Sequence, residues 1–269
     1  MTPAALRATA RAWLDGGRPA MEVLVLEHRG SVPREAGTRM LVAADAVAGT
    51  IGGGHLELQA IERARQRLAQ RETAIDDRVV ALGPTLGQCC GGTVVLRTQP
   101  LTTASVAAWP EPPPRFVLQL YGAGHVGRAI VRLLAGIDCR VQWIDERESE
   151  FPAEPLPPHI ESVCVEPVEA EVHAAPPGAC YLVLTHSHDL DLRITEAILR
   201  RGDFAYCGLI GSKTKRARFV HRFEQRGVPR EAIARLTCPI GVPGIVGKEP
   251  EVLAVAVVAQ LLQASHRDV

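Results

Sequence analysis

Short apolar runs alternate with segments of helical periodicity through the second half of the sequence. The runs predict strands, at residues 116–121, 141–144, 160–165, 180–184 and 204–210. The other segments predict helices: one begins near His125, one ends at Arg201, one begins near Lys213, and one spans Pro250–Ala264. Strands that alternate with helices form parallel sheets covered on both faces, so this half is predicted to be an α/β domain.

The first half has a different order of elements. They are a helix at 3–15, strands at 21–28 and 39–43, a helix at 55–70 and a strand at 93–97. This order indicates a smaller α+β domain. The stretch Trp-Pro-Glu-Pro-Pro-Pro at 109–114 is stiff and proline-rich, as linkers are. We therefore expect domains at 1–108 and 115–269, joined by this linker.

The turn after the strand that ends at Tyr121 carries glycines in G-x-G-x-x-G spacing: Gly122, Gly124 and Gly127. In this spacing the glycines provide a tight turn, close approach of the backbone to a phosphate, and close packing of helix on strand. The helix that begins near His125 directs its free N–H groups at the phosphate, and Asp145 is placed to accept a hydrogen bond from a ribose 2′-hydroxyl. These features predict a C-terminal Rossmann-like parallel sheet, with NAD or another nucleotide as a candidate ligand.

Composition narrows the class of protein. Of the 269 residues, 46% are hydrophobic and 22% charged, and the formal net charge is zero. These values describe a globular protein and argue against binding to nucleic acid or to an anionic membrane. The seven cysteines form no C-x-x-C pair, and we recognise neither a signal peptide nor an apolar run long enough to cross a membrane. We therefore expect a cytoplasmic protein.

Two glycine-rich loops of the first half carry candidate chemistry. Gly52, Gly53 and Gly54 precede a helix and offer bare backbone to an anion, with a tight strand-to-helix turn as the alternative reading. Cys89 and Cys90 are flanked by glycines, which predicts accessible thiols suited to a soft metal or to sulfur transfer. Three other cysteines stand within apolar runs and are predicted to be core residues: Cys164, Cys180 and Cys207.

Two polar clusters follow strands of the second half. The pattern His186-x-His188-x-x-Asp191 lacks the spacing of a metallohydrolase site, so we expect the histidines to line the crevice at the carboxyl ends of the strands. Asp189 is predicted to cap the helix that follows. The next helix opens with Ser212 and Lys213, which are candidate phosphate ligands. Its basic residues share one face, which is either solvated or a docking surface: Lys215, Arg218, Arg222 and Arg226.

The loop motifs occur together in the order found in one known family. They are Arg-Gly-Ser-Val-Pro-Arg at 29–34, Gly-Thr-Ile-Gly-Gly-Gly at 49–54, Gln-Cys-Cys-Gly-Gly at 88–92, Gly-Ala-Gly-His-Val-Gly at 122–127, Thr-His-Ser-His-Asp at 185–189, Gly-Leu-Ile-Gly-Ser-Lys at 208–213 and Pro-Ile-Gly at 239–241. Over nearly its whole length the chain resembles the XdhC/CoxI family, accessory proteins of xanthine dehydrogenase and related molybdenum hydroxylases. It departs from the family at 242–245, where Val-Pro-Gly-Ile replaces the usual Leu-Asp-Ile-Gly.

The resemblance implies a cytosolic chaperone without turnover of its own. Such a protein binds molybdenum cofactor, holds it while a cysteine desulfurase supplies the terminal sulfido ligand, and delivers it to apo-xanthine dehydrogenase or a related enzyme. Molybdopterin is a phosphorylated, sulfur-rich anion, so its expected ligands are bare backbone N–H groups at Gly52–Gly54, arginines and a soft thiolate. The candidate arginines are Arg29, Arg34 and Arg39, and the candidate molybdenum ligand is Cys89, with Cys90 as the alternative.

Two other functions are compatible with the same residues. An NAD-dependent oxidoreductase would use the Rossmann-like domain conventionally, but the sequence shows no recognisable acid–base pair for hydride transfer. A regulatory module would bind a nucleotide and have no affinity for molybdopterin. The client enzyme, the nucleotide content of the cofactor and a homodimeric assembly are left open by the sequence.

Overall fold

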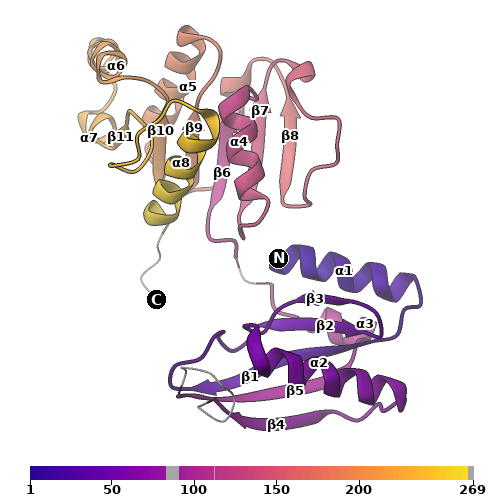
Figure 1. The fold of residues 1–269 in the computed structure, drawn as a ribbon. Coiled ribbons are helices and arrows are strands. Elements are labelled where there is room, and N and C mark those ends of the chain that lie inside the picture. The colour runs from indigo at the N-terminus through magenta and orange to yellow at the C-terminus, as the bar shows by residue number, and fades with distance from the viewer. Residues whose placement is uncertain (83–90, 112, 266–269) are drawn as a thin grey trace. The chain divides into compact units, whose positions relative to one another are not determined.

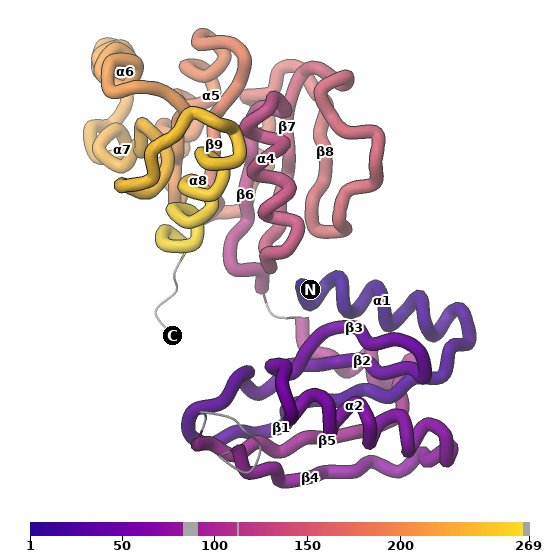
Figure 2. The backbone as a smooth tube through the Cα atoms, in the orientation of Figure 1, coloured from indigo at the N-terminus to yellow at the C-terminus, as the bar shows by residue number. Residues whose placement is uncertain are grey.

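The chain divides into two compact units, Met1–Glu111 and Pro112–Val269, in a computed structural model. The structure describes residues 1–82, 91–111 and 113–265. The boundary between the units falls inside the proline-rich stretch at 109–114. Each unit has its own sheet and its own hydrophobic core, and Figures 1 and 2 trace the chain through them.

The first unit is built on a five-stranded antiparallel sheet in the order β3-β2-β1-β5-β4. Its elements are α1 (Pro3–Asp15), β1 (Ala20–Arg29), β2 (Arg39–Ala43), β3 (Val47–Gly49), α2 (Gly54–Ala69), β4 (Asp76–Ala81), β5 (Thr93–Pro100) and α3 (Thr103–Ala107). The predicted smaller α+β domain is therefore confirmed. Two of the strands, β3 and β4, were not predicted, because β3 has three residues and β4 is a largely exposed edge strand.

Alternation along the strands sends side chains to two separate core clusters. Met40 and Val42 of β2 pack with Leu56 and other residues of α2, whereas Leu41 of β2 packs with Leu6 of α1. The two helices thus cover opposite faces of the sheet, as the period of two residues in a strand requires.

The second unit contains a six-stranded sheet in the order β11-β10-β9-β6-β7-β8, with every pair parallel. Its strands are β6 (Val117–Tyr121), β7 (Arg140–Asp145), β8 (Ile160–Cys164), β9 (Cys180–Val183), β10 (Tyr206–Leu209) and β11 (Leu236–Thr237). Its helices are α4 (His125–Leu134), η2 (Glu148–Glu150), η3 (Val168–Ala174), α5 (His188–Arg201), α6 (Lys213–Gln225), α7 (Arg230–Ala234) and α8 (Pro250–Ala264). This strand order is the Rossmann order, so the predicted fold class is confirmed.

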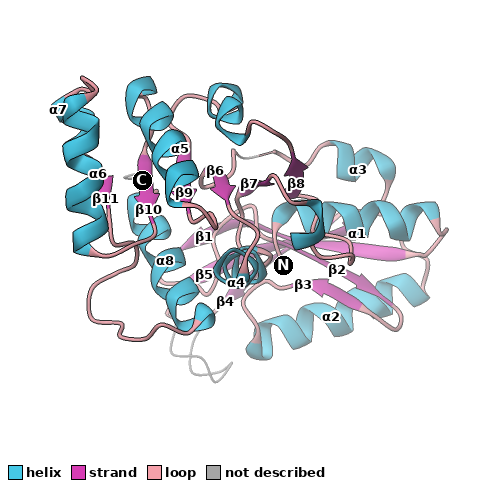
Figure 3. Ribbon diagram, turned by 90° about the horizontal axis from the view of Figure 1, so that it is seen from above, coloured by secondary structure: helices cyan, strands magenta, loops and turns pink. Residues whose placement is uncertain are grey.

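Helices cover both faces of the second sheet. Residues of α4 and α8 share one core cluster, and residues of α5, α6 and α7 share the other. Figure 3 shows α4 and α8 on one side of the row of strands and α5 on the other. Among the described residues, no helix is both long and apolar enough to cross a membrane.

One predicted core cysteine lies at the surface. Cys180 and Cys207 are buried as expected, but Cys164 is exposed. It is the last residue of β8, which is an edge strand and pairs only with β7. Most side chains of β8 are exposed or only partly buried, which an apolar run in the sequence does not reveal.

Candidate functional site

The glycines of the β6–α4 turn have different surroundings. Gly122 has φ +118°, and a Cβ atom on it would lie 2.3 Å from the Leu184 carbonyl oxygen. A Cβ on Gly127 would lie 2.1 Å from the Gly122 carbonyl oxygen, so the start of α4 packs directly on the turn. A Cβ on Gly124 would meet nothing within 4 Å. Gly122 and Gly127 therefore serve packing, and Gly124 presents open backbone beside the exposed His125.

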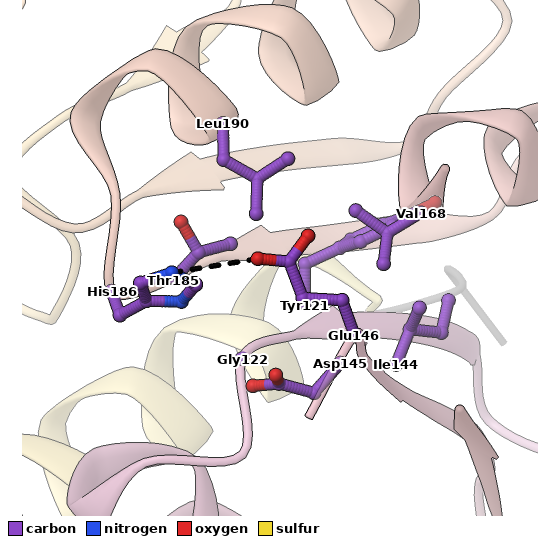
Figure 4. A pocket seen from close by; sticks show the side chains of 9 residues that line it. All are labelled: Tyr121, Gly122, Ile144, Asp145, Glu146, Val168, Thr185, His186 and Leu190. Atoms are coloured by element: carbon purple, nitrogen blue, oxygen red, sulfur yellow. Dashed lines mark ion pairs between the residues drawn. The ribbon is translucent and has the colours of Figure 1, made fainter. Parts of the chain in front are cut away.

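A shallow pocket lies beside this turn (Figure 4). Its lining comes from the carboxyl ends of β6 and β7, the turn after β9, and residues of η3 and α5: Tyr121, Gly122, Ile144, Asp145, Glu146, Val168, Thr185, His186 and Leu190. The chain runs from β6 to β7 and β8 in one direction and places β9 on the other side of β6. The pocket thus lies at the point where the strand order reverses, which is the ligand-binding crevice of open α/β sheets.

Asp145, the expected ribose acceptor, is saturated by donors of its own chain. Its Oδ1 accepts hydrogen bonds from Arg147 N at 3.0 Å and Arg147 Nε at 2.9 Å. Its Oδ2 accepts from Ala123 N at 2.7 Å and Arg147 Nη2 at 2.9 Å. Asp145 is 4% exposed. Burial alone would raise the pKa of this carboxyl, but the bonds from Arg147 and from Ala123 N outweigh it and hold the pKa below its usual value.

Further ion pairs connect Arg147 to α4. Arg147 Nη1 lies 3.4 Å from Glu150 Oε1, and Glu150 Oε2 accepts a hydrogen bond from Arg128 Nη2 at 2.7 Å. Arg128 belongs to α4, one turn beyond Gly124. A series of hydrogen bonds and ion pairs therefore connects the glycine-rich turn, through η2, to α4.

Of the two histidines expected at this crevice, the structure brings one to the pocket. His186 Nε2 lies 3.5 Å from Glu146 Oε1 across the pocket, and their side chains are 41% and 27% exposed. His188 is exposed at the start of α5 and does not line the pocket. The helix cap is Ser187, whose side chain accepts from Leu190 N, so the prediction that Asp189 is the cap is wrong. The residues that the structure describes contain no group of three or more potential metal ligands.

The turn that carries His186 also contacts a buried ion pair that was not predicted from the sequence. Asp191 Oδ1 accepts from Thr185 N at 3.0 Å and from Thr185 Oγ1 at 2.7 Å, and Lys215 Nζ donates to Asp191 Oδ2 at 2.5 Å. The side chains of Asp191 and Lys215 are 1% and 11% exposed. The sequence predicts Lys215 on a basic face of α6 that is either solvated or a docking surface. For this residue the prediction is wrong, because its ammonium group points inward and bonds to Asp191. Lys213 remains exposed at the start of α6.

In the first unit, three loops named by the sequence motifs pack together at one end of the sheet. A Cβ on Gly52 would lie 2.4 Å from Pro33 Cβ and 3.5 Å from Arg34 Cγ, so the loop before α2 touches the loop after β1. A Cβ on Gly92 would lie 2.6 Å from the Arg29 carbonyl oxygen, so the start of β5 touches that loop as well. Arg29 and Arg34 are both exposed there.

Arg39, the third candidate arginine, already binds residues of its own domain. Its Nε donates to Oε1 of the buried Glu22 at 2.9 Å, and its guanidinium lies 5.4 Å from the centre of the Trp109 ring. Gln99 Nε2 donates to the other oxygen of Glu22 at 3.0 Å. Arg39 therefore compensates a buried carboxylate and is not placed with Arg29 and Arg34.

The Gly52–Gly54 backbone is partly occupied by the chain itself. All three glycines have positive φ angles, between 64° and 122°. Glu57 Oε2 accepts from Ile51 N at 3.0 Å and Gly53 N at 3.1 Å, and Gly52 N donates to Thr50 Oγ1 at 3.1 Å. An external anion would have to displace the Glu57 carboxylate from these N–H groups. The sequence signal for this was the acid in the first turn of α2.

Cys89 and Cys90 lie outside the described residues. The segment that contains them leaves the described chain after Leu82 and rejoins it at Gly91. Leu82 N donates to the Gly92 carbonyl oxygen at 2.8 Å. The described residues Leu82 and Gly92, on either side of this segment, are therefore in contact, and Gly92 adjoins Arg29.

Known proteins resemble the chain in both units. Residues 13–80 match the model of the XdhC and CoxI family, and residues 118–261 match that of the XdhC Rossmann domain. The protein YqeB of Escherichia coli (strain K12) is 35% identical over 252 residues, which are 90% of this chain and 43% of YqeB. The chain therefore spans less than half the length of that relative.

A solved structure shares the complete fold. It is described as a xanthine dehydrogenase from Bacillus halodurans and superposes with a TM-score of 0.77 at 19% identity, covering 100% of this chain and 97% of that one. At this identity the likeness concerns the fold alone. The two sequence matches together cover most of both units, and the chain belongs to the XdhC and CoxI family.

Proposed function

We propose that the chain is an accessory protein of xanthine dehydrogenase maturation that carries molybdenum cofactor as cargo. It receives the cofactor, holds it while a cysteine desulfurase provides the sulfido ligand, and delivers it to apo-xanthine dehydrogenase or a related molybdenum hydroxylase. Family membership supports the role in maturation. The observation that carries the cofactor assignment is the convergence of the Arg29–Arg34, Gly52–Gly54 and Gly91–Gly92 loops at one end of the first sheet.

The residues at this end fit a phosphorylated, sulfur-rich anion. Arg29 and Arg34 are exposed cations, and Arg side chains bind phosphate through paired N–H groups. Gly53 leaves open space for a ligand, but Ile51 N and Gly53 N already have the Glu57 carboxylate as acceptor. We therefore propose that the two arginines make the main contacts with the phosphate and that the Gly52–Gly54 backbone contributes less.

Cys89 is our proposed molybdenum-side ligand, and Cys90 is the alternative. The proposal rests on the sequence, since a glycine-flanked thiol is accessible and thiolate is a soft ligand. The buried thiols differ in chemistry: burial raises the pKa of Cys180 and that of Cys207 to about 12, so both remain protonated at neutral pH. They do not compete as metal ligands.

Cys89→Ala is expected to lower the molybdenum and pterin content of the purified protein on the order of tenfold or more, because alanine provides no replacement for a thiolate bond. The measurement is metal analysis and pterin fluorescence of protein purified from a molybdenum-replete host. Two controls are matched: Cys164→Ala removes an exposed thiol, and Cys207→Ala a buried one. Both should keep their cofactor. Full cofactor content in the Cys89→Ala,Cys90→Ala double variant would show that neither thiol holds the cargo.

The second unit supports an additional candidate role, nucleotide binding. The open backbone at Gly124 and the pocket at the reversal of strand order are the features that favour it. An NAD-dependent oxidation is the alternative function for this unit. Reduction of NAD with added alcohols or acids would support the oxidoreductase, and cofactor content without such turnover would support the accessory role.

A further inference from the structure

The pocket contains two adjacent acids, and only one of them has acceptor capacity left. An ionised carboxylate has about four lone-pair positions. Asp145 uses its oxygens for four hydrogen bonds, three of them from Arg147 and one from Ala123 N. A ligand hydroxyl could bond to Asp145 only after Arg147 had moved, and that movement would leave a buried carboxylate with fewer donors.

Glu146 is placed differently. Its side chain is 27% exposed, and its carboxylate accepts no hydrogen bond within the described part of the chain. His186, at 3.5 Å, is the polar side chain that faces it (Figure 4). Val168 and Leu190 line the same pocket with apolar side chains. The Thr185 hydroxyl, also in the lining, lies within hydrogen-bond distance of Asp191 Oδ1 and of the Ser187 carbonyl oxygen, which leaves Glu146 and His186 as the polar side chains that can meet a ligand.

We propose that Glu146 is the residue that recognises the ligand in this pocket, and that Asp145 is a positioning residue for the glycine-rich turn. The ligand is a nucleoside diphosphate group, with its phosphates at the open backbone of Gly124 and a ribose 2′-hydroxyl donating to Glu146. Asp145 holds Ala123 N, and through Arg147 and Glu150 it connects the turn to α4. This assignment reverses the usual role of the acid at the end of the second Rossmann strand. It goes beyond the cofactor proposal and does not depend on it.

The test is isothermal calorimetry with ADP and 2′-deoxy-ADP, which differ by the one hydroxyl in question. We expect the unmodified protein to bind ADP about tenfold more tightly or better, as a hydrogen bond to a charged acceptor predicts. Glu146→Ala should bring the two affinities within about twofold of each other. Glu148→Ala is the matched control, because Glu148 is exposed and does not line the pocket, and it should keep the preference.

Asp145→Asn separates positioning from recognition. If Asp145 orders the turn, the variant should bind both nucleotides more weakly by the same factor and keep the preference for ADP. Loss of the preference in Asp145→Asn together with its survival in Glu146→Ala would overturn the proposal. So would equal affinities in the unmodified protein, or no binding of either nucleotide. Should Asp145→Asn fail to fold, Glu146→Ala and its control decide the question, since the Glu146 side chain is partly exposed. Cofactor content is a separate measurement, so failure here leaves the cargo proposal standing.

Discussion

Gly127→Ala is expected to destabilise the second unit by about 3 kcal/mol or more, whereas Gly124→Ala, three residues earlier, is expected to change its stability little. The added methyl at Gly127 would lie 2.1 Å from the Gly122 carbonyl oxygen. Neither atom can rotate away, because the backbone fixes the position of a Cβ and the carbonyl oxygen is itself a backbone atom. Overpacking of this kind costs about 3 kcal/mol at the upper end of its usual range, and more where backbone must move.

Gly124→Ala is the control, because it replaces a glycine of the same region without creating a steric clash. At Gly124 a methyl would meet nothing within 4 Å, and the backbone there has φ −70°, which alanine adopts readily. Its cost is expected to stay below about 1 kcal/mol, because Gly124 is an N-cap position without a side-chain cap for the substitution to remove. Urea unfolding, with hydrogen exchange to locate the change in peptides of the second unit, measures both. Equal stability of the two variants would mean that α4 does not pack on the turn as described.

Lys215→Met is expected to destabilise the second unit by about 3–5 kcal/mol, the usual cost when one partner of a buried pair is removed. The substitution keeps the apolar stem of the side chain and deletes the ammonium that donates to Asp191 and to the Ile210 carbonyl oxygen. The Asp191 carboxylate, 1% exposed, would then keep only the two donors of Thr185.

Arg218→Met is the matched control for this substitution. Arg218 lies on the same helix and is exposed, so its replacement should change the free energy of unfolding by less than about 0.5 kcal/mol. The same urea and exchange measurements apply. A Lys215→Met variant as stable as Arg218→Met would show that the ammonium contributes little at this position and that the pair is not buried in solution.

The sequence predicted the second unit well because its signals are local. Strands buried on both faces appear as unbroken apolar runs, and the spacing of Gly122, Gly124 and Gly127 specifies a strand–turn–helix unit. The helix at Pro250–Ala264 was predicted with the bounds that the structure has. Three edge strands were missed because they lack such signals: β3, β4 and β11. The strand β4 begins Asp-Asp-Arg, and β11 has only two residues.

The candidate sites were less predictable, since they depend on contacts between residues far apart in the chain. Nothing in the local sequence shows that Lys215 reaches Asp191, 24 residues earlier, or that Gly92 touches Arg29. Asp145 was identified from its position after the second strand, but its saturation by Arg147 depends on side-chain geometry that spacing does not encode. The motif around Arg29 and Arg34 pointed to a functional loop, and only the fold shows which other loops it meets.

The central claim is that the chain delivers molybdenum cofactor, and reconstitution of apo-xanthine dehydrogenase tests it most directly. The apo-enzyme is mixed with this protein loaded with cofactor, with and without a cysteine desulfurase, and its activity is compared with that obtained from the same amount of free cofactor. We expect the loaded protein to activate the enzyme more completely than free cofactor, to need the desulfurase for full activity, and to lose its effect in the Cys89→Ala,Cys90→Ala variant. Activation no better than that by free cofactor, or full activation by the double variant, would contradict the account.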